Sequence, residues 1–271
     1  ERILIPISNP QTMPQLLDIS NLIKQRNNKT LYALKINNDP EDTSGAKLLD
    51  SAAKLASATD NKLIQIMKCD LNISNCIIDT VQANKITDLI VGIHHKANIV
   101  DTFLGGTITA LINGTSHQNL IIYGPKRPIN SVKRLVVTVP QMAELEIGFD
   151  LWFDRVKNIA SQLSIPIVFY ANKTTTEALK KQCEIHSSLN VSFRELASWE
   201  DFLIISKDIK HSDTLIVITA RKATVSYNNL FEKIPYYLNK YFADNNFLLI
   251  YPQQTATDGT DNDIYNPLKI N

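Results

Sequence analysis

The chain has 271 residues, of which 44% are hydrophobic and 20% charged, a balance typical of one large or two modest globular domains. Its 28 basic and 27 acidic side chains leave a net charge of +1, which disfavours nucleic-acid binding because the chain has no global positive field. Three cysteines without a C-x-x-C spacing favour neither a disulfide framework nor a zinc site, and they indicate a reducing compartment.

The first half alternates short β-branched apolar runs with amphipathic stretches, which is the pattern of βαβ units in a parallel sheet. The predicted strands are residues 2–8, 30–37, 62–68, 88–92 and 119–123. The predicted helices are residues 13–25, 44–58, 72–83 and 106–113, the third capped by Asn72 or Asp70. The order of elements is therefore β-α-β-α-β-α-β-α-β.

A proline-bracketed basic stretch at residues 124–128 is typical of a linker, and the same pattern begins again after it. The second set of predicted strands is residues 133–139, 165–170, 190–194, 213–220 and 246–251. The helices between them are residues 144–162, 175–186, 201–209 and 227–242. A repeat of this length indicates duplicated domains and not a solenoid. We predict domains at residues 1–128 and 129–271, with a polar tail from about residue 253.

No apolar run reaches the roughly 20 residues that a membrane-spanning helix needs. The chain opens on Glu1 without an initiator methionine and passes almost at once into a strand pattern, as an excised domain would. We therefore expect a folded module that does not itself enter a bilayer. The nature of the part that precedes it in the full protein is left open.

The loop after the fourth strand is the candidate binding site, because parallel sheets bind ligands outside the carboxyl ends of their strands. This loop follows Gly92 and reaches Gly105, Gly106 and Thr107 at the start of a helix. Glycines permit positive φ angles and a close approach of backbone N–H groups to an anion, and a helix N-terminus adds partial positive charge. The loop predicts a phosphate site, with a tight turn into the helix as the alternative.

The spacing of this loop resembles the universal stress protein family, whose nucleotide-binding members carry Gly, two residues, Gly, nine residues, and then Gly-Ser or Gly-Thr. Gly92, His95, Gly105 and Gly106 stand at these positions, so a histidine replaces the second glycine and a glycine replaces the hydroxyl residue. Ser8 stands where these members present an Asp at the end of the first strand.

The resemblance implies an α/β fold of two tandem doubly wound five-stranded parallel-sheet domains, of the universal stress protein or adenine nucleotide alpha hydrolase-like type. Each domain is expected to form its own sheet with strand order 3-2-1-4-5. The last strands of the two domains, residues 119–123 and 246–251, are expected to lie near each other, because the family pairs its domains through that edge and sheet edges need covering.

Several longer strings are similar to the soluble C-terminal region of sodium/proton antiporters of the CPA2 type in Bacteroidetes. They are residues 2–17, 56–60, 139–149, 220–227, 233–235 and 250–252, which together extend over nearly the whole chain. This resemblance implies a non-enzymatic regulatory or assembly module at the cytoplasmic face of the bacterial inner membrane. Its expected partners are the membrane-spanning antiporter domain of the same polypeptide and a second copy in a homodimer.

A nucleotide in the first domain would place its phosphates against residues 105–107 with Lys96 nearby, and its base near Ser8. His95 and Gly106 remove a close-approach position and a hydroxyl donor, so we expect ATP, AMP or cyclic di-AMP to bind more weakly than micromolar. Two alternatives stay open: a free-standing stress protein that binds and slowly hydrolyses ATP, and a ligand-free dimerisation scaffold.

The corresponding loop of the second domain, residues 219–226, has no glycine, so we expect this domain to stay empty. Arg221 and Lys222 in that loop are interpreted as a solvated basic turn, with an anion or another subunit as the alternative partner. Elsewhere only His94 and His95 are adjacent histidines, and no hydrolase or Walker-type phosphate motif occurs, so neither a metal site nor catalysis is expected.

Residues 227–242 combine aromatic and basic side chains, which raises the possibility of a nucleic-acid or membrane surface. Leu230, Ile234, Tyr237, Leu238 and Tyr241 fall at helical spacings. This spacing favours a helix that packs on the sheet.

Overall fold

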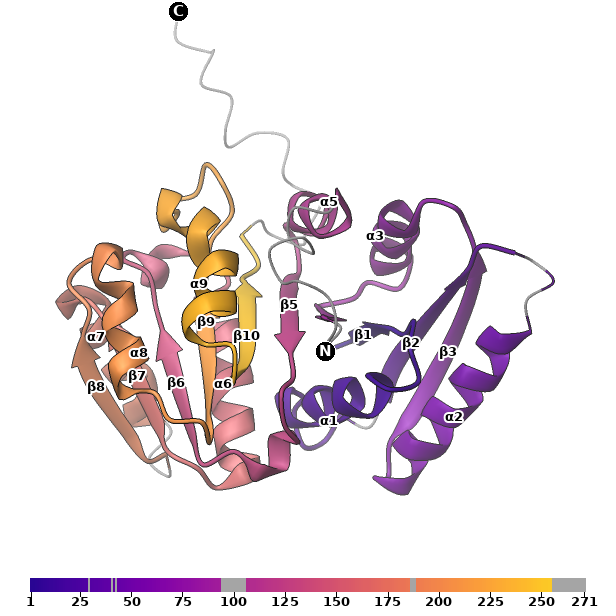
Figure 1. Cartoon of the computed structure of the whole chain (residues 1–271), viewed down its shortest axis with the longest axis horizontal. Coiled ribbons are helices and arrows are strands. Elements are labelled where there is room, and N and C mark those ends of the chain that lie inside the picture. Colours follow the sequence, from indigo (N-terminus) through magenta and orange to yellow (C-terminus); the bar gives the residue numbers. More distant parts are fainter. Residues whose placement is uncertain (29, 40, 42, 94–105, 186–188, 255–271) are drawn as a thin grey trace, which may run out of the picture.

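The computed structural model describes residues 1–28, 30–39, 41, 43–93, 106–185 and 189–254. Within this part the chain forms one sheet of ten strands in the order β3-β2-β1-β4-β5-β10-β9-β6-β7-β8 (Figure 1). Every pair of neighbouring strands is parallel except β5 and β10.

The N-terminal half supplies one side of the sheet. Its strands are β1 (Ile3–Pro6), β2 (Thr30–Asn37), β3 (Lys62–Cys69), β4 (Asp88–Gly92) and β5 (Asn119–Gly124). Its described helices are α1 (Met13–Ile23), α2 (Ser44–Ala58), α3 (Ile73–Ala83) and α5 (Gly106–Gly114). Asn72 caps α3, since its side chain accepts a hydrogen bond of 3.1 Å from the backbone N–H of Asn75. The order of elements predicted for this half is confirmed.

The C-terminal half supplies the other side. Its strands are β6 (Arg134–Thr138), β7 (Ile167–Ala171), β8 (Val191–Glu195), β9 (Asp213–Ile218) and β10 (Asn246–Tyr251). Its α-helices are α6 (Phe149–Leu163), α7 (Lys173–Ile185), α8 (Ile205–Asp208) and α9 (Ile234–Tyr241). Short 3₁₀ helices are η1 (Ile129–Ser131), η2 (Ala143–Leu145), η3 (Trp199–Ile204) and η4 (Asn229–Lys233). The helices predicted at 144–162, 201–209 and 227–242 therefore each begin with a 3₁₀ segment.

The two halves repeat one strand order. Read from its outer edge, each half runs third, second, first, fourth and fifth strand, so the expected order 3-2-1-4-5 is found twice. The sheets were expected to be separate, but β5 and β10 pair antiparallel and join them into one. The physical reason is that each fifth strand would otherwise present an unpaired edge.

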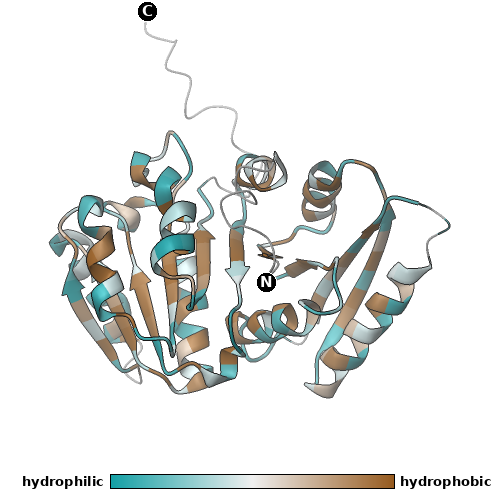
Figure 2. Ribbon diagram, in the orientation of Figure 1, coloured by the Kyte–Doolittle hydropathy of each residue, from teal (hydrophilic) through white to brown (hydrophobic). Residues whose placement is uncertain are grey.

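The fifth strands are apolar on both faces, as a central position in a sheet requires. All six residues of β5 and all six of β10 are buried. Leu248 lies opposite Tyr123, and Phe247 lies opposite Gly124. Figure 2 shows apolar residues along the strands of both halves, whereas the helices carry a polar and an apolar side.

Helices cover both faces of the sheet. Side chains of α1, α2, α6 and α7 pack in one buried cluster, to which Ile3 and Ile5 of β1 also belong. Side chains of α3, α5, α8 and α9 pack in a second cluster, which includes Leu4 of the same strand. This alternation along β1 is the period-two pattern of a strand buried on both sides.

The packing of residues 227–242 on the sheet, which their helical spacing predicts, is confirmed for two of the residues at that spacing. Ile234 and Leu238 of α9 are fully buried in the second cluster. Tyr241, which shares that spacing, is 41% exposed and belongs to neither buried cluster.

Candidate functional site

Ser8 follows strand β1, and Gly92 ends strand β4, which is the neighbour of β1 in the sheet. β1 and β4 are parallel neighbours with Ile3 opposite Asp88, so their carboxyl ends meet at the same edge of the sheet. Ser8 is exposed at that edge, and Gly92 is the last residue of β4. The structure thus brings these two predicted site residues to one side of the N-terminal half.

The remaining predicted site residues divide into two groups. Gly106 and Thr107 are exposed and form the first turn of α5. His95, Lys96 and Gly105 lie outside the described residues. A Cβ atom added to Gly106 would meet none of the described residues within 4 Å.

Gly92 has a packing role that its place in the sequence pattern did not reveal. A Cβ atom on Gly92 would lie 3.0 Å from Cδ2 and 3.2 Å from Cδ1 of Leu16 in α1. No described glycine has a positive φ angle. The small size of Gly92 therefore allows α1 to approach β4, and the positive φ expected of a phosphate-loop glycine is absent at this position.

The corresponding edge of the C-terminal half contains a carboxylate of the chain itself. Glu146, which follows η2, accepts hydrogen bonds from the backbone N–H of Ser226 at 3.0 Å and from its hydroxyl at 2.6 Å. Ser226 lies in the loop after β9, which corresponds in strand order to the predicted phosphate loop after β4 of the N-terminal half. An internal anion thus occupies donors in this loop, and no sequence pattern indicates this contact.

The segment after β10 packs against the same region. A Cβ atom on Gly148 would lie only 2.4 Å from the carbonyl oxygen of Gln253, so glycine is required for this contact. The side chain of Gln254 accepts a hydrogen bond of 2.7 Å from the backbone N–H of Arg221. The chain's own backbone therefore covers part of the carboxyl edge of the C-terminal half.

Arg221 is buried, which corrects the interpretation of its loop as a solvated basic turn. Its guanidinium donates to the carbonyl oxygens of Ile112 and Thr115, each at 2.7 Å, and to that of Pro252. Ile112 is in α5 and Thr115 directly follows it, so a cation of one half meets the carbonyl end of a helix of the other, where the helix dipole favours positive charge. Burial lowers the pKa of Arg221 to about 10, although the nearby Tyr251 acts in the opposite direction.

Lys222 behaves as the solvated-turn interpretation expects. Its ammonium lies 2.8 Å from a carboxylate oxygen of Glu232, and both side chains are mostly exposed. The hydrogen bond and charge of Glu232 raise the pKa of Lys222.

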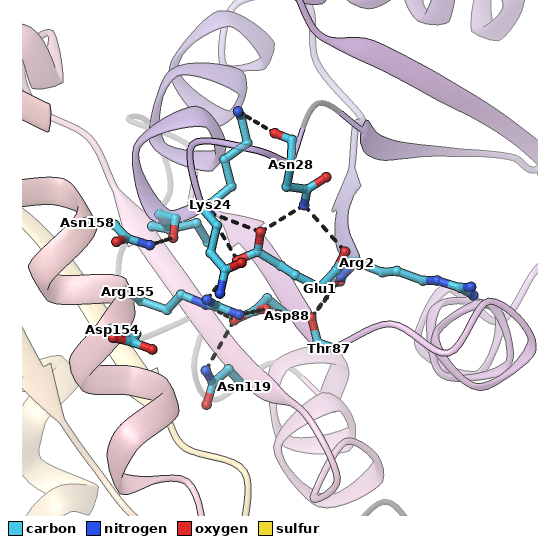
Figure 3. Close-up of polar contacts among 12 residues, drawn as sticks. Glu1, Arg2, Lys24, Asn28, Thr87, Asp88, Asn119, Asp154, Arg155 and Asn158 are labelled. Atoms are coloured by element: carbon cyan, nitrogen blue, oxygen red, sulfur yellow. Dashed lines mark hydrogen bonds and ion pairs between the residues drawn. The ribbon is translucent and has the colours of Figure 1, made fainter.

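A second polar connection between the halves lies at the amino ends of the strands (Figure 3). Arg155 of α6 reaches across to Asp88 at the start of β4, with its Nε 2.9 Å from Oδ1 and a terminal nitrogen 2.7 Å from Oδ2. The other terminal nitrogen lies 2.7 Å from a carboxylate oxygen of Glu1. Asn119 of β5 donates to Oδ1 of Asp88 at 3.1 Å. Burial lowers the pKa of Arg155, but the charges of Asp88 and Glu1 outweigh burial and raise it.

The C-terminal half contains a related pair within itself. Asp213 opens β9 as Asp88 opens β4, and its Oδ2 accepts hydrogen bonds from Nε and a terminal nitrogen of Arg134 at 3.0 and 2.6 Å. Arg134 opens β6. Arg2, the residue before β1, instead donates to the carbonyl oxygen of Asn84. In the C-terminal half, the arginine that pairs with the aspartate at the start of the fourth strand therefore belongs to the same half. In the N-terminal half, the arginine that pairs with the corresponding aspartate comes from the opposite half.

Two classes of site find no support in the part of the chain that the structure describes. No group of three His, Cys, Asp or Glu side chains there is placed to hold a metal ion. Nor does any described helix combine the length and apolar character that crossing a membrane requires.

The chain matches no protein-family model and no curated protein by sequence. Solved structures do match it in fold. The cytoplasmic domain of a prokaryotic cation chloride cotransporter aligns over 93% of this chain and 96% of its own, with a TM-score of 0.67 and 13% identity. A protein of unknown function from Pseudomonas aeruginosa aligns over 93% and 92%, with a TM-score of 0.62 and 14% identity. A universal stress protein from Archaeoglobus fulgidus aligns over 93% and 96%, with a TM-score of 0.60 and 12% identity. The chain thus has a universal stress protein-like α/β fold.

Proposed function

We propose that the chain is a cytoplasmic regulatory or assembly module of a membrane cation transporter. The observation that carries the proposal is its likeness, over nearly the full length of both chains, to the cytoplasmic domain of a cation chloride cotransporter. The resemblance of several sequence strings to CPA2-type antiporters of Bacteroidetes favours a sodium/proton antiporter as the transporter. The transport path then lies in a membrane-spanning domain of the same polypeptide, and this module contributes no transport residue.

The contacts between the halves fit a module that moves as one unit. The β5–β10 ladder, the Asp88–Arg155 ion pair and the contacts of Arg221 all join the two halves through buried groups. Separating the halves would expose a sheet edge and leave buried charges without partners, and both changes are costly. Such a unit can transmit a mechanical force, or the effect of a bound ligand, between a membrane domain and a partner.

Cell fractionation tests the proposal. An antiserum against this chain should detect, in the source cells, a species larger than 30.5 kDa that stays in the membrane fraction after carbonate extraction. Shortening the gene so that this module is lost should then change the transport rate or the amount of assembled transporter. A band near 30.5 kDa in the cytosol would contradict the proposal and favour a free-standing stress protein.

A nucleotide in the N-terminal half is the second part of the proposal. The space around Gly106 among the described residues and the shared strand edge of Ser8 and Gly92 favour this half, whereas the contact of Glu146 with Ser226 favours an empty C-terminal half. Calorimetric titration with ATP, AMP and cyclic di-AMP should give at most one site, with an affinity weaker than micromolar, that is, a binding free energy below roughly 8 kcal/mol. Gly105→Val should abolish it.

Each alternative gives a different titration. Tight binding that survives Gly105→Val would place the site elsewhere. No heat from any of the three nucleotides at millimolar concentration would favour a ligand-free scaffold. Turnover of ATP at enzyme-like rates, in a preparation free of other ATPases, would contradict the non-enzymatic proposal.

Homodimer formation remains part of the proposal and needs its own test. The fifth-strand edge of each half is already occupied by the other half, so a dimer of this chain must use a different surface. Light scattering of the purified chain over a range of concentrations should give twice the mass of 30.5 kDa. A constant mass of one chain would contradict it.

A further inference from the structure

A cavity of about 520 Å³ lies between α5 of the N-terminal half and the η4–α9 segment of the C-terminal half. We name it the α5–α9 cavity. Among the described residues, four aromatic side chains line it: Tyr227, Phe231, Tyr236 and Tyr251. Its volume is within the range of small-molecule sites, which are mostly apolar with a few polar groups. None of the described residues predicted for the nucleotide site lines it.

The aromatic walls are held in fixed positions by contacts behind them. The ring of Phe231 stands edge-on to Tyr227 at 5.8 Å and edge-on to Trp199 at 4.8 Å, between ring centroids. Trp199 is buried and stacks on Phe202. Aromatic rings of this kind bind flat rings through offset stacking and edge contacts, in addition to the area that they bury. The walls thus favour a planar aromatic ligand.

The charges that line the cavity have an excess of positive sign. Arg221 and Lys222 are cations, and Glu232 is the one acidic residue among the described lining residues. Glu232 is already paired with Lys222 at 2.8 Å. The guanidinium of Arg221 bonds only to carbonyl and hydroxyl oxygens, and no carboxylate of the described chain forms an ion pair with it. A buried cation without a counter-charge favours an anion nearby.

We propose that the α5–α9 cavity binds a small planar aromatic anion, with its ring against Phe231 and Tyr236 and its negative group toward Arg221 and Lys222. The ligand would contact both halves, because α5 and η4–α9 belong to different halves. The proposal goes beyond the proposed function and does not depend on it, since it concerns another site and makes no use of a membrane domain.

Two fluorescent probes that differ by one sulfonate group test the proposal on the full chain. The first is 1-anilinonaphthalene-8-sulfonate, which is an aromatic anion, and the second is N-phenyl-1-naphthylamine, which lacks the sulfonate. We expect one saturable site for the anionic probe, with an affinity about tenfold or more above that of the neutral probe. Equal affinities, or several non-saturating sites, would overturn the proposal.

Two variants with matched controls locate the site. Thr109→Trp places a large ring on α5 inside the cavity and should abolish the binding of both probes, whereas Thr174→Trp, on an exposed position of α7, should change neither. Lys222→Gln should weaken the anionic probe about tenfold and leave the neutral probe unchanged. Lys233→Gln removes an equal charge from an exposed residue that does not line the cavity and should have no such effect. Binding that persists in Thr109→Trp would overturn the proposal.

Competition then separates two sources of such an anion. Displacement of the anionic probe by salicylate but not by AMP would assign the cavity to aromatic acids, and displacement by AMP would assign it to nucleotides. Failure of both at millimolar concentration would overturn the proposal, because probe binding would then reflect apolar surface alone. Equal urea midpoints of all four variants and the unchanged chain would establish that the losses are not due to unfolding.

Discussion

Arg155 and Asp88 form a bidentate ion pair between the two halves of the chain, with one side chain 2% exposed and the other fully buried. Each group has further partners, since Glu1 takes the second terminal nitrogen of Arg155 and Asn119 donates to Asp88. A buried ion pair gains stability only when its remaining hydrogen-bonding capacity is satisfied, which is the case here. The pair therefore fixes α6 of one half to β4 of the other.

Removing one member of this pair should be strongly destabilising. Asp88→Ala leaves Glu1 as the one carboxylate among the described residues that forms an ion pair with the buried guanidinium, and we expect a loss of about 3–5 kcal/mol in the free energy of unfolding. Arg155→Met should cost a similar amount. The double variant should lose less than the sum, with a coupling energy of about 1–3 kcal/mol. Urea denaturation of the four proteins measures this cycle.

The exposed pair of Lys222 and Glu232 serves as the control for this cycle. Its atoms are 2.8 Å apart, but both side chains are mostly exposed, so water and salt screen the interaction. Lys222→Ala should therefore cause a much smaller loss than Arg155→Met. Losses of similar size, or strict additivity of Asp88→Ala and Arg155→Met, would contradict the role given to the buried pair.

The junction strand β5 should be sensitive to one added methyl group. A Cβ atom on Gly124 would lie 2.2 Å from Cε1 and from Cζ of Phe247, its partner in β10. Phe247 is buried, so its ring has little room to move, and overpacking of this kind costs typically about 1–3 kcal/mol. We expect Gly124→Ala to lower the urea midpoint accordingly.

Gly106→Ala is the matched control for Gly124→Ala. No atom of the described residues lies within 4 Å of a Cβ atom at Gly106, and this residue is helical. The same substitution should therefore be neutral or stabilise the protein by about 0.4–1 kcal/mol. An equal loss for the two variants would show that the contact with Phe247 does not limit the junction.

The covering of the C-terminal edge by the segment after β10 can be tested at Gly148. Its added Cβ would lie 2.4 Å from the backbone oxygen of Gln253, and backbone cannot turn away as a side chain can. Gly148→Ala should displace this segment and break the hydrogen bond of 2.9 Å from the backbone N–H of Gln254 to the carbonyl oxygen of Ser116. Hydrogen exchange at the Gln254 amide should then become faster. Unchanged protection of this amide would contradict the prediction.

The order and type of the strands could be predicted from the sequence because the chain follows the simple rule for a sheet buried on both faces. Short, mostly apolar runs, such as Asn246–Tyr251, alternate with amphipathic helices, and propensity and periodicity agree along most of the chain. The strand order 3-2-1-4-5 came from resemblance and not from the pattern. The joining of β5 to β10 was only partly anticipated, since edge pairing has no sequence period of its own.

The polar connections between the halves could not be predicted with the same rules. Arg221 looks like a surface residue in sequence, and it is buried because the end of α5 and the segment after β10 both approach it. Two features of the sequence nevertheless indicate these connections. Asp88 and Asp213 each open an apolar strand, and Arg155 stands among the apolar positions of α6 beside Trp152 and Val156. A charged residue at such positions indicates a buried partner.

The stability of the protein should fall between pH 10 and pH 12, in part because of Tyr251. Burial raises the pKa of its phenol to about 12, and the charge of Arg221 offsets this only in part. The unfolded chain has an ordinary tyrosine pKa near 10, so between these values the folded state holds a proton that the unfolded state has lost. Stability linked to this phenol is therefore complete below pH 10 and is lost as the pH rises toward 12, by up to about 1.4 kcal/mol per pH unit.

Arg221 acts with the opposite sign, because its folded pKa of about 10 lies below that of a free guanidinium, so its contribution to stability rises with pH above 10. Tyr170, whose pKa is raised to about 12 by burial and by its hydrogen bond to Asp208, acts with the same sign as Tyr251. The two phenols outweigh the one guanidinium, and the net slope is downward. Urea denaturation from pH 9 to pH 12 should show that the free energy of unfolding declines less steeply with pH in Tyr251→Phe than in the unchanged chain. The difference should reach up to about 1.4 kcal/mol per pH unit. An identical decline in the two proteins would show that the phenol of Tyr251 ionises as readily in the folded chain as in the unfolded one.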